Sequence, residues 1–79
     1  MDHGHNGRMD ISIGEDMIRL GQLLKFANVV SDGAEAKFLI ATGAVRVDGE
    51  VETQRGRQVH PGSVVEVNSG NSVSLHVVR

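Results

Sequence analysis

DGAEAKFLIATGAVRVDGEV, residues 32–51, is the stretch that decides the fold. Asp32 with Glu35 three positions later has the spacing of a helix capping box. The pattern predicts a helix over residues 33–42, and Gly43 suits the left-handed position that follows a helix end. A helix and then a hairpin are therefore expected from this stretch alone.

The predicted helix is apolar nearly all round when its residues are projected at about 100° each. An apolar helix of this kind is typical of a buried position. We expect it to be covered on two sides, by another helix and by a sheet. One face carries Ala34, Phe38 and Ala41, and the other carries Ala36, Leu39 and Ile40.

The segment VRVDGEV that closes the stretch predicts a β-hairpin, because Asp-Gly between β-prone runs favours a tight turn. A two-residue turn would pair Arg46 with Val51 and mix a charge with an expected core residue. A three-residue loop with a glycine bulge would instead pair Arg46 with Glu50. The side-chain pattern favours the second register and the dipeptide favours the first, so both stay open.

One further helix is predicted before this stretch, from apolar residues at the i, i+3, i+4 and i+7 spacing. We expect it to begin at Glu15 and Asp16, whose carboxylates suit the positive end of a helix dipole. It should end near Val29 or Val30. A short edge strand is expected at 10–13. The apolar face consists of Leu20, Leu23, Leu24 and Ala27.

The residues after the stretch predict the strands that finish a small sheet. Pro61-Gly62 has proline and glycine at the two central positions of a turn. Strands are expected at 64–67 and 73–78, with a turn over 68–71 between them. The sequence thus predicts an α+β fold, with two packed helices against a small, bent antiparallel sheet of four to five short strands.

The chain of 79 residues predicts a single domain over 10–79 after a disordered tail at 1–9. A free Met1-Asp2-His3 terminus has the nitrogen ligands that Cu(II) or Ni(II) prefers, although a solvated tail is the simpler interpretation and we expect no metal site. The chain lacks cysteine and any apolar run of about 20 residues. We expect a cytoplasmic monomer with no membrane association.

No catalytic constellation or phosphate-binding glycine motif stands out in the sequence, so we expect neither an enzyme nor a cofactor. The net charge is −2, and the two Phe are the only aromatic residues, which argues against base stacking on aromatic platforms. Arg55-Gly56-Arg57 lies in an acid-free loop and offers forked cations suited to phosphate. A continuous basic face formed by Lys37, Arg46, Arg55 and Arg57 would support nucleic-acid binding.

An ordered series of short segments carries a resemblance to a known family. The segments are LGQLLK (20–25), AEAK (34–37) with Leu39-Ile40, GAVRVDG (43–49), and Pro61-Gly62 before Val64-Val65. Over residues 18–67 they resemble the S-four RNA-binding domain, or alpha-L motif. Residues 17–25 and Arg55-Gly56-Arg57 are most similar to its short free-standing branch.

The resemblance implies two helices on a small bent sheet and binding to structured ribosomal or transfer RNA, with a ribosomal subunit or another translation protein as a further partner. Binding would use the second helix, the hairpin and the basic loop. Carried over by position, the RNA contacts are Lys37, Arg46, Arg55 and Arg57, with Lys25 as an additional candidate.

Two other functions are compatible with the residues. The valine-rich second half is faintly similar to β-grasp carriers, which end in Gly-Gly, whereas this chain ends in Val77-Val78-Arg79. That ending disfavours a carrier but not a protein-interaction module. A subunit or appended domain that helps a larger enzyme hold RNA is the other alternative.

Overall fold

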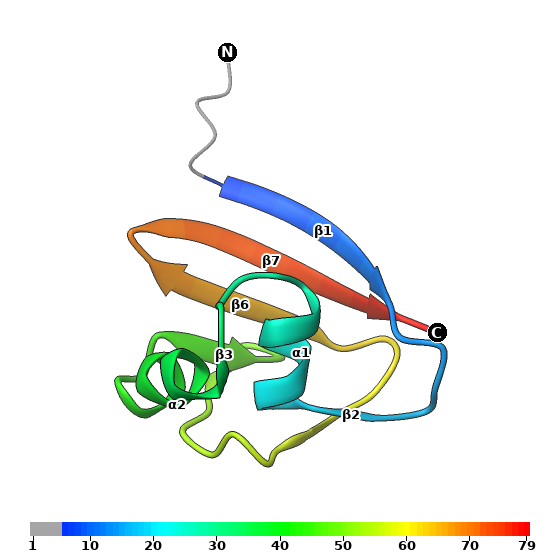
Figure 1. Cartoon of the computed structure of the whole chain (residues 1–79). Coiled ribbons are helices and arrows are strands. Elements are labelled where there is room, and N and C mark those ends of the chain that lie inside the picture. Colours follow the sequence, from blue (N-terminus) through cyan, green and yellow to red (C-terminus); the bar gives the residue numbers. More distant parts are fainter. Residues whose placement is uncertain (1–5) are drawn as a thin grey trace.

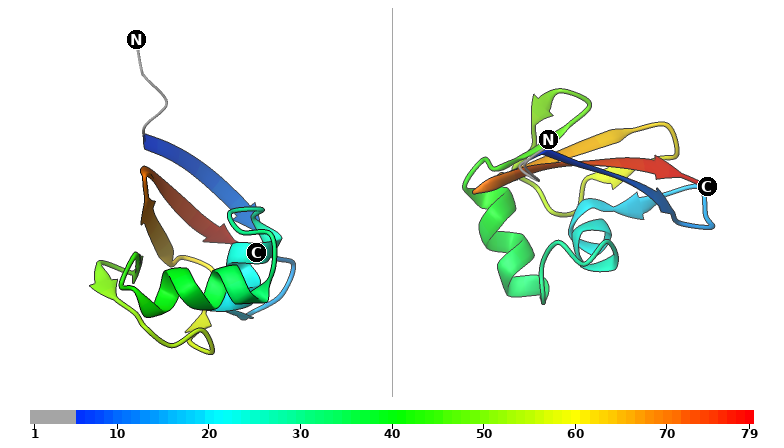
Figure 2. Two further views of the ribbon diagram at one scale, coloured as in Figure 1. Left: turned by 60° about the vertical axis from the view of Figure 1, so that its left-hand side comes forward. Right: turned by 90° about the horizontal axis from the view of Figure 1, so that it is seen from above.

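A computed structural model describes residues 6–79 and has two layers (Figure 1). Both helices lie on one face of the main sheet, as the two views of Figure 2 show. In chain order the elements are β1 (Asn6–Ser12), β2 (Ile18–Arg19), α1 (Leu20–Phe26), α2 (Gly33–Ala41), β3 (Val45–Val47), β4 (Glu50–Val51), β5 (Gln58–Val59), β6 (Val64–Ser69) and β7 (Asn71–Val78).

The main sheet has five strands in the order β1-β7-β6-β3-β4, and β2 pairs with β5 in a separate two-stranded sheet. The predicted α+β fold of two helices on a small sheet is confirmed. The sheet is mixed, because β1 runs parallel to β7 while the other neighbours are antiparallel. A parallel partner 66 residues away along the chain leaves no local signal in the sequence, so only the antiparallel pairs were predictable.

The N-terminus of α2 has the predicted capping interactions. Asp32 Oδ1 accepts a hydrogen bond from Glu35 N at 2.9 Å, and Glu35 Oε1 accepts one from Ser31 N at 2.8 Å. Helix α2 ends at Ala41, and Gly43 follows with a φ of 82° in the left-handed region. Local spacing therefore predicted both ends of this helix.

The expectation that α2 is covered on two sides was wrong. Ala36 and Ile40 are buried on the side facing α1 and the sheet, whereas Phe38 is 66% exposed. Ala34 and Ala41 are also exposed. No described element packs over this outer face, because a chain this short has too few elements to cover every apolar side chain.

The hairpin adopts the two-residue turn. Arg46 pairs with Val51 and Val47 pairs with Glu50, while Asp48 and Gly49 have φ of 53° and 90°. Two positive φ values define the type I′ turn that Asp-Gly favours. The objection to this register disappears because Val51 is exposed and does not belong to the core.

Helix α1 is shorter than predicted at both ends. It begins at Leu20, so Glu15 and Asp16 lie in the preceding loop and not at the helix N-terminus. Strand β2 occupies the intervening residues by pairing with β5, a contact between distant segments that helical periodicity does not reveal. The helix ends at Phe26, and Asn28 has a φ of 63°, which breaks the helical path before Val29.

The N-terminal strand is longer than predicted, since β1 begins at Asn6 and not at residue 10. Residues 6–9, assigned to the tail from the sequence, therefore form part of the sheet. Pairing with β7 holds them there, although their sequence lacks the alternation of apolar residues that would have predicted a strand. The Met1-Asp2-His3 motif lies outside the described residues. The Pro61-Gly62 turn is confirmed by a bond from Ser63 N to His60 O at 3.0 Å.

The core lies between the helices and one face of the main sheet. Both helices and strands β1, β3, β5, β6 and β7 contribute buried side chains to this core, and the partly buried Ile18 of β2 packs against it. Within the described range no helix is long and apolar enough to cross a membrane. The fully enclosed side chains are Leu20, Leu23, Leu24, Ile40, Val45, Val47, Val59, Val65, Val67, Leu75 and Val77.

Candidate nucleic-acid interface

The basic loop is fixed to the N-terminus of α1 through its backbone. Leu20 N donates to Arg57 O at 2.8 Å, and Gly21 N donates to Arg55 O at 2.9 Å. These carbonyls satisfy amides at the start of a helix whose N-cap residue makes no side-chain capping bond. The Arg-Gly-Arg motif therefore has a structural role, and its exposed Arg55 side chain stays available for a ligand.

A hollow of about 290 Å³ lies where this loop meets α1 and the beginning of α2. Three cationic side chains contribute to its wall, and no Asp or Glu lines it in the part of the chain that the structure describes. The local charge is therefore positive although the whole chain carries −2. The hollow is lined by Arg19, Gly21, Gln22, Lys25, Gly33, Ala36, Arg55 and Gly56.

Glycines bring the backbone to the surface of this hollow. At Gly21 an added Cβ would lie 3.3 Å from Arg55 Cβ, so the absence of a side chain lets the loop approach the helix closely. At Gly33 an added Cβ would meet nothing within 4 Å, so this first residue of α2 presents its backbone to open space. A phosphate-bearing ligand could approach main-chain groups as well as cations here.

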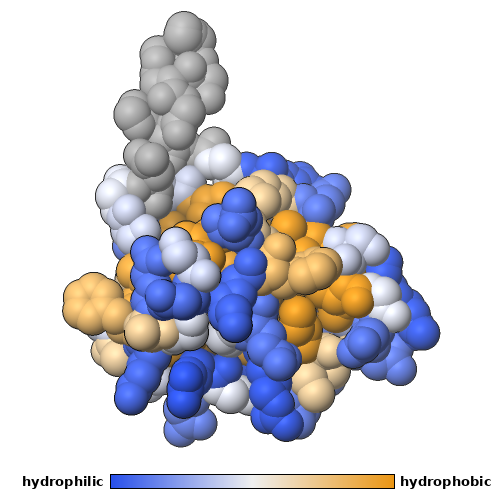
Figure 3. Space-filling model, in the orientation of Figure 1, coloured by the Kyte–Doolittle hydropathy of each residue, from blue (hydrophilic) through white to orange (hydrophobic). Residues whose placement is uncertain are grey.

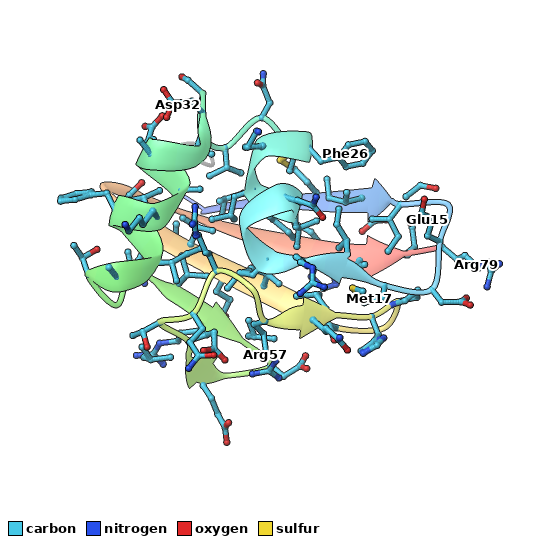
Figure 4. All side chains as sticks on the ribbon, turned by 60° about the horizontal axis from the view of Figure 1, so that its bottom comes forward. Glu15, Met17, Phe26, Asp32, Arg57 and Arg79 are labelled. Carbon is cyan, nitrogen blue, oxygen red and sulfur yellow. The ribbon has the colours of Figure 1, made fainter. Side chains whose placement is uncertain are left out.

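Two acids close to this hollow are engaged locally. Asp32 and Glu35 both accept hydrogen bonds from backbone amides at the start of α2. Figure 4 shows Asp32 at the N-terminal end of α2, at the top of the view, and Arg57 near the bottom. Asp32 directly precedes Gly33, so its carboxylate places a negative charge beside the position where an anionic ligand would approach Gly33.

Two of the five residues predicted to contact RNA come together, since Lys25 and Arg55 line the same hollow. Lys37 is exposed on α2, one turn from Gly33, and lies at the edge of this region. The remaining two, Arg46 and Arg57, lie elsewhere, so the four-cation face expected from the sequence does not form.

Arg57 is held in an ion pair on its own loop. Its Nη1 donates to Glu52 Oε1 at 2.7 Å, and the Glu52 side chain is only 17% exposed. The bond from Arg57, together with the bond from the Gln54 amide, lowers the pKa of Glu52 below its ordinary value. Arg57 therefore already has a counter-ion within its own loop.

Arg46 lies on the opposite face of the sheet from the helices. Its neighbours Val45 and Val47 are buried, and side chains alternate along a strand, so Arg46 points outward. There it stands across from Glu66 and shares a second hollow with it. The alternation of Val45, Arg46 and Val47 was visible in the sequence. It already indicated that Arg46 points away from the core and from any site on the helical side of the sheet.

Arg19 is the functional candidate that the sequence prediction missed. It lines the hollow, and its Nη1 donates to Gly56 O at 3.4 Å. The available signal was its position three residues before Gln22 and six before Lys25, on the polar side of the expected helix.

Two apolar features lie near this region. A third hollow, of about 390 Å³, borders α1 on the other side and is lined mainly by apolar residues that include Met17 and Phe26. Both side chains are labelled in Figure 4. Figure 3 shows the corresponding apolar area beside α1, flanked by hydrophilic side chains. The basic and apolar hollows thus adjoin along one helix.

Two helices on a small sheet, with a basic hollow at the helix–loop junction, define a compact domain of the alpha-L type. The chain belongs to the S4 domain family, whose model matches residues 11–75. This confirms the family expected from the sequence.

Individual relatives are similar over most of their lengths. A protein of Bacillus subtilis named "Probable ribosome maturation protein RlbA" is 42% identical over 65 residues, which are 82% of this chain and 92% of that protein. YbcJ of Escherichia coli K12 is 40% identical over 58 residues, which are 73% of this chain and 81% of YbcJ.

A solved structure agrees with the fold. The solution structure of YbcJ from Escherichia coli superposes with a TM-score of 0.65 at 35% identity, and covers 96% of both chains. It is described as revealing an alpha-L motif involved in RNA binding.

Proposed function

We propose that this protein is a non-catalytic module that binds structured RNA through the hollow between α1, α2 and the basic loop. The single observation that carries this proposal is the grouping of Arg19, Lys25 and Arg55 around one hollow without an acidic lining residue. The description of YbcJ as carrying an RNA-binding motif supports the same ligand class.

The chemistry of the hollow suits a phosphate backbone. Arg19 and Arg55 offer planar forks that can bind phosphate oxygens through two parallel bonds, and Lys25 adds a point charge. The chain has no Trp or Tyr, and the exposed Phe26 and Phe38 are not among the described residues that line this hollow, so its lining offers no aromatic ring for base stacking. Recognition should therefore depend on the shape and backbone of folded RNA more than on base identity.

Ribosomal RNA is the target that we favour within this class. The Bacillus subtilis relative has a name that refers to ribosome maturation, and its similarity covers 92% of that protein. A small domain with about three phosphate contacts suits a role in which it joins and leaves a larger assembly. Transfer RNA is the comparison ligand in the test below.

The test is a salt series of binding to ribosomal RNA fragments and to transfer RNA. With three phosphate contacts, the slope of log K against log salt should be about −2 to −3. Arg55→Glu should weaken binding roughly tenfold, since it removes one charge-assisted contact. It should also make the slope shallower by about one.

Arg46→Glu is the matched control, because it makes the same charge change on the outer face of the sheet. It should leave affinity and slope nearly unchanged. Equal losses in both variants would show that only net charge matters, and wild-type binding without a salt slope would refute the proposed site.

A further inference from the structure

Strand β1 leaves a long free edge at one end of the main sheet. Among the residues that the structure describes, it pairs only with β7, and Figure 1 shows it as the outermost described strand. The strand has seven residues and contains no proline. An unprotected edge of this length presents unpaired amides and carbonyls that can template pairing with another strand.

One hydrogen bond shows whether the odd- or the even-numbered residues of β1 direct their backbone groups away from β7. Ile13 N donates to Val78 O at 2.9 Å, just beyond the end of β1. Because backbone groups alternate sides along a strand, odd-numbered residues of β1 direct their amides and carbonyls toward β7. The free amides and carbonyls at the outer edge therefore belong to Asn6, Arg8, Asp10 and Ser12.

Two charged side chains stand on this edge. Arg8 Nε lies 3.6 Å from Asp10 Oδ1, and the two side chains are 68% and 62% exposed. They share the outer face of the sheet, since they are two residues apart. An edge with one charge of each sign, spaced symmetrically about Met9, is complementary to a copy of itself in the antiparallel direction.

We propose that β1 pairs with β1 of a second copy of this chain, antiparallel and centred on Met9. This register places Arg8 opposite Asp10 of the second copy, and Asp10 opposite Arg8 of that copy. It also places all seven residues of one β1 opposite residues of the other. Even-numbered residues then lie opposite even-numbered residues, so their free amides and carbonyls can form hydrogen bonds with one another.

The neighbouring registers allowed by backbone parity are less favourable. Centring the pair on Arg8 would place two arginines opposite each other, and centring it on Asp10 would place two aspartates opposite each other. Like charges directly across a strand pair are destabilising. Charge therefore selects the same register that maximises overlap.

The side chain of Met9, on the helix side of the sheet, favours the same register. It is 37% exposed on the helix side of the sheet, where its register partner on β7 is the buried Leu75. Pairing about Met9 brings two of these side chains together and removes both from water. The proposed dimer joins two five-stranded sheets with both helical layers on one side, and it departs from the monomer expected from the sequence.

The first test uses the lack of cysteine in the chain. In the proposed register, the two copies of residue 9 form a non-hydrogen-bonded pair with Cα atoms about 4.5 Å apart, which a disulfide can bridge. Met9→Cys should therefore cross-link under mild oxidation into a species of twice the mass. Ser12→Cys is the control, since residue 12 lies roughly 20 Å from its copy at about 3.4 Å per residue.

The second test is a charge exchange followed by sedimentation of the full chain over a concentration series. Arg8→Asp and Asp10→Arg should each abolish the wild-type dimer, and an equimolar mixture of the two variants should restore it. A wild type that stays monomeric at every concentration overturns the proposal. So does equal cross-linking of the two cysteine variants, or dimerisation of either charge variant alone.

Discussion

Exposure, more than residue type, decides what an apolar side chain contributes in this domain. Leu24 is fully buried on α1, whereas Phe38 on α2 is 66% exposed. Leu24→Ala should lower the free energy of unfolding by about 2–5 kcal/mol, because it leaves a cavity in the core. Phe38→Ala should change it by less than about 0.5 kcal/mol. Urea unfolding of both variants checks this, and a large loss at Phe38 would contradict the described packing.

Asp32 has two separable effects on α2. Asp32→Ser keeps a side chain that can accept from the Glu35 amide but removes the charge, so stability should change little. Removing the negative charge beside Gly33 should strengthen RNA binding. Asp32→Ala should lower the free energy of unfolding by about 0.5–2 kcal/mol. Thermal unfolding and RNA titrations on the same three proteins separate the effects, and weaker binding by Asp32→Ser would contradict the account.

Glu52 predicts a pH dependence of stability. The bond from Arg57 lowers the pKa of Glu52 in the folded chain below its ordinary value of 4.5. A depressed carboxylate pKa stabilises the fold at pH above that ordinary value, and this contribution is lost as the pH falls through the folded-state pKa. In Glu52→Gln this contribution is absent at every pH. The difference in unfolding free energy between wild type and Glu52→Gln should therefore shrink as the pH falls. Urea unfolding of both proteins from pH 7 to pH 3 measures it, and a difference that stays constant would contradict the prediction.

The junction between the basic loop and α1 is the element on which the proposed site depends. Gly21→Ala places a Cβ 3.3 Å from Arg55 Cβ, so the loop must shift away from α1. Gly33→Ala is the control, because its Cβ meets open space. Alanine should stabilise α2 by up to about 0.5–1 kcal/mol at Gly33, and Gly21→Ala should show no such gain.

Amide hydrogen exchange provides the structural readout for this pair of variants. Gly21→Ala should accelerate exchange at Leu20 and at position 21, whose amides donate to the loop carbonyls. Gly33→Ala should leave both amides protected. Equal protection in the two variants would mean that the loop accommodates the methyl group without moving.

The sequence predicted those elements whose determinants lie within a few residues. The capping box of α2 and the Pro61-Gly62 turn needed only local spacing, and both were confirmed. Strand β2 and the early start of β1 depend on partners distant in the chain, so local patterns did not reveal them. The exposure of Phe38 depends on how many elements remain to cover α2, which composition alone does not determine.

At the scale of the whole molecule, the candidate site was only partly predictable for the same reason. Arg55 was identified by its charge in an acid-free loop, and Lys25 was an additional candidate carried over from the family resemblance. The ion pair of Arg57 with Glu52 and the outward direction of Arg46 depend on the folded chain. Arg19 joins the group because Gly56, in a loop 37 residues later, folds back against it.

The central claim is that RNA binds at the hollow on the helical side of the sheet. The most direct test is to follow the backbone amide resonances of the isotope-labelled protein as a ribosomal RNA fragment is added. Binding at this hollow should give the largest shifts at Gly21, Gly33 and Gly56, with small changes around Arg46 and Ser74 on the outer face. The largest shifts on that outer face, or shifts spread evenly over the whole chain, would contradict it.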